Sequence, residues 1–160
     1  MKTKIFCDSA DITTIKEFNK NPLVSGFTTN PSLMRKAGAK DYKNYSLKLL
    51  SVCKKKPISL EVFADKFDEM IRQANIINSW GKNVYVKIPV VNSKGLFSGA
   101  VINKLSNKGI KLNITAVYTV PQVRKIIKNL NKKSKTIISI FAGRMSDAGK
   151  DPLPIIRESV

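Results

Sequence analysis

The chain has 160 residues, of which 42% are hydrophobic, and its 29 basic against 11 acidic residues give a formal net charge of +18. Its length allows one domain with a real core, and this composition excludes a disordered chain. No run of about 18 apolar residues occurs, so no transmembrane helix is expected. The absence of histidine excludes a histidine-based triad or zinc site. We therefore expect one domain over residues 1–160.

In chain order, hydrophobic periodicity and capping signals predict alternating strands and helices. The expected elements are a strand at 4–7, a helix at 12–19, a strand at 23–27, a short helix from Pro31 to near Gly38, a helix from Asp41 to about Cys53, a strand at 58–62, a helix at 66–80, a strand at 84–90, a helix from Ser93 to near Gly109, a strand at 112–116, a helix from Thr119, a strand at 136–141 and a helix starting at Asp151–Pro152.

Helix starts are marked by residues that can accept hydrogen bonds from the first-turn amides. Asp11 and Asp41 are expected N-caps, and Asn30 is an N-cap followed by Pro31 as the first helical residue. The stretch Thr119–Gln122 fits a capping box.

Strands recur about every 20 to 35 residues, which favours a parallel sheet with right-handed crossovers. A doubly wound sheet and a barrel both fit this spacing. No glycine-rich dinucleotide turn follows the first strand, which disfavours a Rossmann domain.

The strand at 84–90 carries Lys87 in the middle of apolar and β-branched residues. Burial disfavours the charged ammonium form, and a neutral amine is a nucleophile toward carbonyls, as in Schiff-base enzymes. The alternative is a lysine whose stem packs in the strand while its head reaches water.

Polar residues are concentrated at or just after the expected carboxyl ends of the strands. In a (β/α)8 barrel these ends form the catalytic face, whereas a sheet without a site more often carries apolar residues or glycine there. We therefore predict an α/β protein of the (β/α)8 TIM-barrel type, with about six of the eight βα units in this chain. The residues concerned are Asp8, Thr28, Asn30, Glu61, Lys87, Asn113, Thr115, Ser139 and Arg144.

Several of these residues fall in stretches that resemble the transaldolase family, especially the small bacterial transaldolases and the fructose-6-phosphate aldolases. Each stretch is common alone, but all of them in this order are highly specific. They are Phe6–Asp11 (FCDSAD), Phe27–Ser32 (FTTNPS), Val86–Pro89 (VKIP), Asn113–Tyr118 (NITAVY) and Ser139–Arg144 (SIFAGR).

The resemblance implies a class I transaldolase without metal or cofactor, in which Lys87 forms a Schiff base with a ketose phosphate. Asp8 is the implied proton acceptor during carbon–carbon cleavage, and Glu61 and Thr115 hold the water used in proton transfer. The residues implied to bind substrate are Thr28, Asn30, Asn113, Ser139, Phe141 and Arg144, the last of them through phosphate.

The reaction so implied transfers a dihydroxyacetone unit from sedoheptulose 7-phosphate to glyceraldehyde 3-phosphate, within the pentose phosphate pathway. Glu61 and Phe141 separate it from the aldolase branch, which carries glutamine and tyrosine there, although Phe141 alone is equally an ordinary core aromatic. Two alternatives stay open: a fructose-6-phosphate aldolase-like enzyme, and an inactive remnant that acts as a basic binding protein.

The charge of the chain suits an anionic partner, either a phosphorylated metabolite or nucleic acid. Short clusters at Lys54–Lys56 and Lys132–Lys133 lack interleaved aromatic residues, which argues against nucleic acid, and a solvated basic surface is the simpler interpretation. We expect sugar phosphates as partners, no membrane, and a homo-oligomer as an open alternative. Cys7 and Cys53 have no metal-ligand spacing and indicate free thiols in a reducing, cytoplasmic compartment.

One departure from the family concerns the end of the barrel. The family's barrel has eight strands, and the seventh and eighth, with their additional phosphate contacts, have no counterpart here. We therefore expect a C-terminally truncated barrel, whose first and sixth strands are exposed edges.

Overall fold

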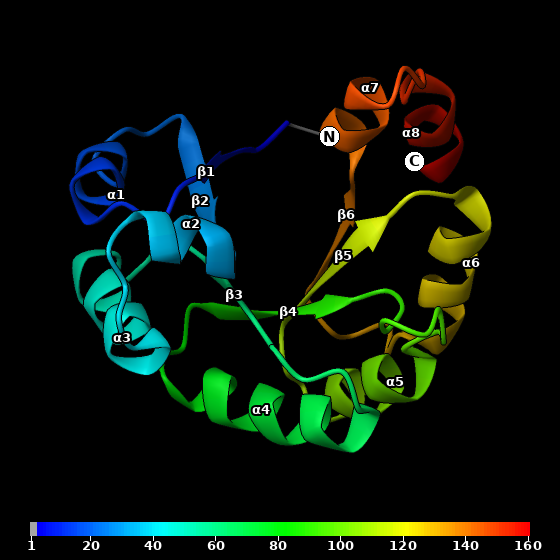
Figure 1. Ribbon diagram of the computed structural model, residues 1–160, viewed down its shortest axis with the longest axis horizontal. Helices are drawn as coiled ribbons and strands as arrows, with labels where there is room; N and C mark the ends of the chain where they lie inside the picture. The colour runs from blue at the N-terminus through cyan, green and yellow to red at the C-terminus, as the bar shows by residue number, and fades with distance from the viewer. Residues whose placement is uncertain (1–2) are drawn as a thin grey trace. The chain divides into compact units, whose positions relative to one another are not determined.

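A computed structural model describes residues 3–160 as alternating strands and helices (Figure 1). The strands are β1 (Ile5–Asp8), β2 (Val24–Thr28), β3 (Ile58–Glu61), β4 (Val84–Pro89), β5 (Leu112–Val117) and β6 (Thr136–Ile140). The helices are α1 (Ile12–Phe18), α2 (Pro31–Lys36), α3 (Tyr42–Val52), α4 (Phe67–Ser79), α5 (Gly99–Asn107), α6 (Val120–Asn129), α7 (Ala142–Asp147) and α8 (Leu153–Ser159).

The six strands form one sheet in the sequential order β1-β2-β3-β4-β5-β6. The pairs β1–β2, β2–β3 and β5–β6 are parallel. Strand β4 is bonded to β3 through Ile58 N and Asn83 O (3.0 Å), and the residue after β4, Val90, donates to Thr115 O of β5 (2.9 Å). Parallel strands in sequential order with helical crossovers confirm the predicted (β/α)8 type of fold, of which six βα units are present.

The chain divides into two compact units, which share strand β4. One contains the residues up to Glu61 together with Ile76–Val86, and the other contains Val62–Asn75 and Lys87–Val160. Fully buried side chains fill the core of each. They are Ile15, Phe27, Met34, Leu49, Ile58 and Leu60 in the first unit, and Met70, Ile88, Ile102, Leu105, Leu112 and Ile114 in the second.

The inner strands are buried on both faces, as parallel sheets require. Close packing is visible at Gly26 in β2, where an added Cβ atom would lie 2.5 Å from the Phe6 ring and 2.7 Å from Pro57. Any larger residue at this position would force the Phe6 ring or Pro57 to move, so the glycine permits this close packing.

Most helix starts are those predicted. Asp11, Asn30 and Asp41 accept hydrogen bonds from the backbone amides of Thr14, Leu33 and Asn44. The Thr119–Gln122 capping box at α6 is also present in full. The strand bounds differ from the predicted ones by about one residue, which is the usual uncertainty at element ends.

The helix predicted from Ser93 is wrong at its start. Helix α5 begins at Gly99, and the preceding residues form a turn in which Gly95 has a φ of +75°. Ser93 caps no helix, because its amide and hydroxyl donate to the two carboxylate oxygens of Asp65 (2.7 and 2.8 Å). A bridge between Val91 and Phe97 closes the turn.

The end of the chain also differs from the prediction. Helix α7 was not predicted, since it is short and contains Gly143. Helix α8 begins at Leu153, just after the predicted start at Asp151–Pro152, and the Asp151 carboxylate accepts a hydrogen bond from Leu153 N (2.9 Å). No helix within residues 3–160 is long and apolar enough to cross a membrane.

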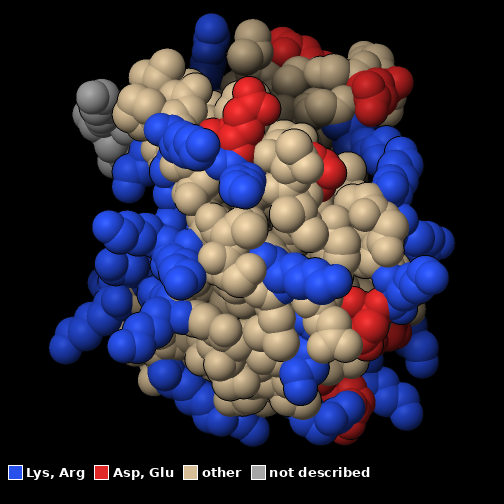
Figure 2. Space-filling view, turned by 90° about the vertical axis from the view of Figure 1, so that its left-hand side faces the viewer, with Lys and Arg blue, Asp and Glu red and all other residues tan. Residues whose placement is uncertain are grey.

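Basic side chains are spread over the face of the molecule that Figure 2 shows. On the face in Figure 2, lysine and arginine cover much of the area, with smaller acidic groups between them. This distribution fits the predicted solvated basic surface better than a single basic stripe.

Candidate active site

The candidate residues of the first unit follow strands β1 and β2. Asp8 is the last residue of β1, Thr28 the last residue of β2, and the two are in register. The Thr28 hydroxyl donates to the Asp8 carboxylate over 2.7 Å. The parallel pairing therefore brings together two predicted site residues that are far apart in the sequence, and Thr28 fixes the orientation of an exposed carboxylate.

Asn30 and its neighbour Thr29 shape the loop after β2. The Asn30 side-chain oxygen accepts from Leu33 N (2.9 Å), so it serves as the N-cap of α2. Thr29 is fully buried and donates through its hydroxyl to Ser59 O of β3 (2.8 Å). This contact ties the loop to the neighbouring strand.

Glu61 ends β3 and is held by a residue that sequence reasoning missed. The Tyr42 hydroxyl donates to Glu61 O (2.9 Å) and accepts from Glu61 N (2.8 Å), and its ring packs against Trp80 at 6.0 Å between centroids. Burial, followed by the negative charge of Glu61, raises the pKa of Tyr42 far above its ordinary value. Tyr42 thus stays neutral and anchors the backbone of Glu61. In the sequence Tyr42 showed only the periodicity of an apolar helix face.

Lys87 lies in the second unit, inside β4. The residue is only 8% exposed, and its neighbours Val86 and Ile88 are fully buried. The Lys87 carbonyl accepts from Val62 N at the end of the adjacent strand (3.2 Å). The lysine is therefore largely buried within β4.

Strands β5 and β6 bring Asn113 and Ser139 together. Asn113 is fully buried, and its side-chain oxygen accepts from the Ser139 hydroxyl over 2.7 Å. The prediction that Asn113 stands at the carboxyl end of its strand is wrong, because it is the second residue of β5. Its polar side chain is tolerated in the strand interior because Ser139 satisfies it.

Thr115 combines two unusual features. Its hydroxyl is buried, and among residues 3–160 it has no hydrogen-bond partner. The next residue, Ala116, has a φ of 57°, and the pairing of β5 with β6 is irregular between Ile114 and Val117. A non-glycine residue in this conformation costs free energy of order 1 kcal/mol, and such strain gathers at functional sites. The local geometry thus presents an unsatisfied hydroxyl.

Phe141 and Arg144 lie beyond the end of β6. Phe141 is half-buried, and its ring meets Tyr118 edge-on at 5.6 Å between centroids. Arg144 belongs to α7, where its side chain is 74% exposed and lies 3.8 Å from the Asp147 carboxylate. Its guanidinium therefore has the access that phosphate binding requires.

These residues offer a buried amine, two carboxylates, hydroxyls and an exposed guanidinium. The carboxylates belong to the first unit, and the buried amine and the exposed guanidinium belong to the second. No group of three histidine, cysteine, aspartate or glutamate side chains within residues 3–160 is placed to hold a metal ion.

The fold and these side chains define an α/β protein of the (β/α)8 class with polar and ionisable groups along its strands. The family model described as Transaldolase/Fructose-6-phosphate aldolase matches residues 5–159, and the chain belongs to this family.

The curated relatives agree with this assignment. The chain is 34% identical over 157 residues to a "Probable transaldolase" of Herpetosiphon aurantiacus, covering 98% of this chain and 66% of that protein. It is 37% identical over 155 residues to a "Probable transaldolase" of Streptococcus agalactiae, covering 97% of this chain and 67% of that protein. It is also 37% identical over 157 residues to a "Probable transaldolase" of Dehalococcoides mccartyi, covering 98% of this chain and 69% of that protein. The chain thus spans about two thirds of the length of these proteins.

Proposed function

We propose that this protein is a class I transaldolase that moves a dihydroxyacetone unit between sugar phosphates. Sedoheptulose 7-phosphate and glyceraldehyde 3-phosphate are the proposed substrates, and erythrose 4-phosphate and fructose 6-phosphate the products, within the pentose phosphate pathway. Membership of the family supports the reaction class. The two free cysteines support a reducing, cytoplasmic location.

The proposed chemistry starts at Lys87. Its neutral amine attacks the C2 carbonyl of the ketose and water leaves, which gives a protonated Schiff base. Asp8 takes the proton from the C4 hydroxyl, the C3–C4 bond breaks, and the electron pair moves into the Schiff base to form an enamine, while erythrose 4-phosphate leaves as the first product. The enamine then attacks the aldehyde of the acceptor, the new hydroxyl takes the proton back, and water releases the ketose product.

The other residues of the site assist these steps. Glu61 and the unsatisfied hydroxyl of Thr115 hold the water that carries protons. The substrate hydroxyls are bound by Thr28, Asn30, Asn113 and Ser139, Phe141 lines the site, and Arg144 takes the phosphate.

One observation carries the proposal: the burial of Lys87 in β4 at 8% exposure. Lysine is among the residues least often buried, since removing its charge from water is costly. A reaction that needs an amine at this strand would explain why the chain tolerates the cost of burying Lys87.

The test is reduction with borohydride in the presence of fructose 6-phosphate. We expect a reduced adduct on the peptide that contains Lys87, found by mass spectrometry. The Lys87→Arg variant keeps the positive charge but forms no Schiff base, and it should stay unlabelled. The exposed Lys82 offers a matched control on the same segment, because Lys82→Arg should leave labelling unchanged. Labelling that survives in Lys87→Arg contradicts the mechanism.

A further inference from the structure

Strand β3 extends beyond its neighbour β2 at the carboxyl end, where Glu61 lies. Thr29 N donates to Ser59 O (3.3 Å), and Asn30 then caps α2, so the chain leaves the sheet there. Alternate residues of a strand direct their backbone groups to the same neighbouring strand, so those of Glu61 face the same side as those of Ser59. The next step of the hydrogen-bond ladder therefore falls at Glu61, beyond the last residue of β2.

The hydroxyl of Tyr42, the first residue of α3, takes the place of a β2 partner at this step. It accepts from Glu61 N (2.8 Å) and donates to Glu61 O (2.9 Å). A phenol is both a donor and an acceptor, so one side chain satisfies both backbone groups, as a neighbouring strand would. The Tyr42 ring packs against Trp80 at 6.0 Å between centroids. Burial raises the pKa of Tyr42 far above its ordinary value, so the donated proton is retained at neutral pH.

The second tyrosine of α3, Tyr45, has a different kind of partner. Its hydroxyl lies 2.9 Å from Ala10 O in the loop after β1 and 3.1 Å from Ala37 O at the end of α2. Neither alanine is a candidate site residue. Tyr45 therefore connects parts of the scaffold, whereas Tyr42 holds a residue of the proposed reaction.

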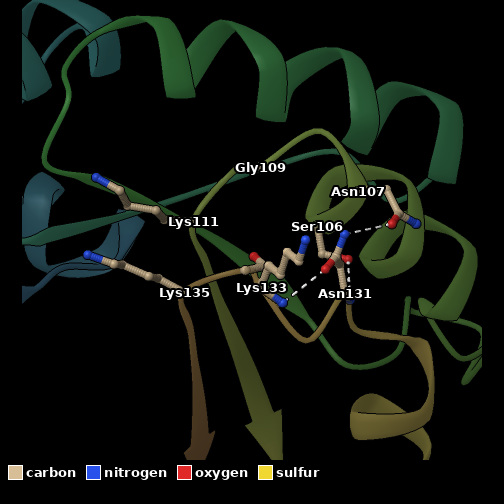
Figure 3. Close-up of a pocket in the computed structure, with 8 residues that line it drawn as sticks. Ser106, Asn107, Gly109, Lys111, Asn131, Lys133 and Lys135 are labelled. Carbon is tan, nitrogen blue, oxygen red and sulfur yellow. Dashed lines mark hydrogen bonds between the residues drawn. The ribbon is translucent and has the colours of Figure 1, made fainter.

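A cluster of polar side chains in the second unit also connects parts of the scaffold. At the amino ends of β5 and β6, Asn131 N donates to the Ser106 hydroxyl (3.1 Å) and the Asn131 side-chain NH₂ donates to Asn107 (3.0 Å), as Figure 3 shows. Lys111 and Lys135 extend away from these groups in the same view, so the charges beside the hollow do not converge. These contacts join two loops and involve no residue of the proposed reaction.

We propose that Tyr42 is a positioning residue for Glu61, holding its backbone so that its carboxylate keeps one place relative to the water that carries protons. This inference rests on the proposed function and gives Tyr42 no contact with substrate. Groups that take part in a reaction must be held within about 0.5 Å of their working positions. The end of a strand without a ladder partner is free to fray, and the Tyr42 hydroxyl prevents this at Glu61. Because Tyr42 acts only through Glu61, its contribution to turnover should depend on that carboxylate.

The first test compares two tyrosine variants in a transaldolase assay with fructose 6-phosphate and erythrose 4-phosphate. Tyr42→Phe keeps the ring and removes the hydroxyl, and we expect kcat to fall about tenfold while KM changes less than about twofold. Tyr45→Phe removes the same atom from the same helix, and kcat should stay within about twofold, because the Asp8 carboxylate is oriented by Thr28. An equal fall of kcat in both variants would show general loosening of α3 and would overturn the proposal.

A double-mutant cycle with Glu61→Gln separates positioning from a merely structural effect. In the Glu61→Gln background, Tyr42→Phe should change kcat less than about twofold, since the group that it positions is already lost. A structural contribution would lower kcat by the same factor in both backgrounds. Effects that multiply in this way contradict the positioning role.

Hydrogen exchange gives a readout that does not depend on activity. We expect the Glu61 amide to be protected in the unaltered chain and to exchange about tenfold faster or more in Tyr42→Phe. The amide of Ile58, which donates to Asn83 O (3.0 Å), should keep its rate and serves as the control on the same strand.

The exchange data also separate this inference from the proposed function. Turnover with an unprotected Glu61 amide contradicts only the inference, and this measurement on the unaltered chain decides the question if Tyr42→Phe does not fold. A protected amide without turnover and without an adduct trapped by borohydride contradicts the proposed function and, with it, the positioning role.

Discussion

At Thr115, a role in packing and a role in function predict different effects of removing the side-chain hydroxyl. Its buried hydroxyl has no partner within residues 3–160, and an unsatisfied buried hydroxyl costs about 1–3 kcal/mol. Nothing in the packing of β5 explains why threonine stands there rather than valine, which has the same shape. The proposed role of Thr115 in holding water would account for it.

We therefore predict that Thr115→Val raises the free energy of unfolding by about 1 kcal/mol while lowering turnover. Urea unfolding and a coupled transaldolase assay measure the two effects. The control is Thr29→Val, because the Thr29 hydroxyl is satisfied by Ser59 O, and its loss should destabilise the protein instead. A variant of Thr115 that is destabilised to the same extent as the control would contradict this assignment.

Glu61 and Phe141 bear on whether the dihydroxyacetone unit is transferred to an acceptor aldehyde or released as free dihydroxyacetone. Phe141 offers no hydroxyl that could help water discharge the enamine, so we predict that dihydroxyacetone forms much more slowly than product when an acceptor aldehyde is supplied. The double change Glu61→Gln and Phe141→Tyr should shift the ratio toward release. This ratio is obtained by measuring free dihydroxyacetone with and without glyceraldehyde 3-phosphate. Equal rates in the unaltered protein would place the chain with the aldolases.

At the scale of elements, features that depend on residues close in the sequence were predicted correctly, whereas features that depend on tertiary contacts were not. The caps at Asp11, Asn30 and Asp41 involve residues a few positions apart, so the sequence contains all that is needed. Ser93 looked like a cap of the same kind, but its hydroxyl is bound by Asp65, a contact that only the folded chain creates. Local propensity cannot anticipate such a competing partner.

The candidate site shows the same division. The positions of Asp8, Thr28 and Glu61 at strand ends followed from the pattern of apolar runs. The Tyr42 contact to Glu61 spans two elements and had no local signal. Asn113 was wrongly assigned to a carboxyl end, although the predicted strand at 112–116 already placed it second, and its hydrogen bond to Ser139 had no local signal.

The outer strands of the sheet are the least covered. In β6 no residue is fully buried, and in β1 Ile5 is 57% exposed, whereas the inner strands are largely buried. Exposed apolar edges recruit other strands. We predict concentration-dependent self-association that Ile5→Lys reduces, measured by sedimentation velocity.

Leu23 provides a control for that experiment, since it is 71% exposed and lies outside the strands. Leu23→Lys adds the same charge and removes a similar apolar surface, and it should leave association unchanged. A chain that stays monomeric at all concentrations, or an equal effect of both variants, would show that the edge of β1 is not the contact.

At the scale of the whole molecule, the prediction of one domain concerns cooperativity. The boundary between the two compact units falls inside β4, so one continuous strand belongs to both of them. We therefore expect a single unfolding transition by calorimetry, with equal calorimetric and van't Hoff enthalpies. Two separate transitions would show that the units fold independently.

Calorimetry can also compare the thermal stability of this chain with that of a longer one. The chain covers 67% of its Streptococcus agalactiae relative, and the interior of an eight-stranded barrel is a packed core. A chimera that continues after Val160 with the remaining segment of that relative should cover the apolar residues of β1 and β6. Because net stability is only about 5–15 kcal/mol, this covering should raise the melting temperature by several degrees and increase turnover. If the 160-residue chain melts at the same temperature as the chimera and turns over as fast, the exposed strands β1 and β6 do not lower its stability or its activity.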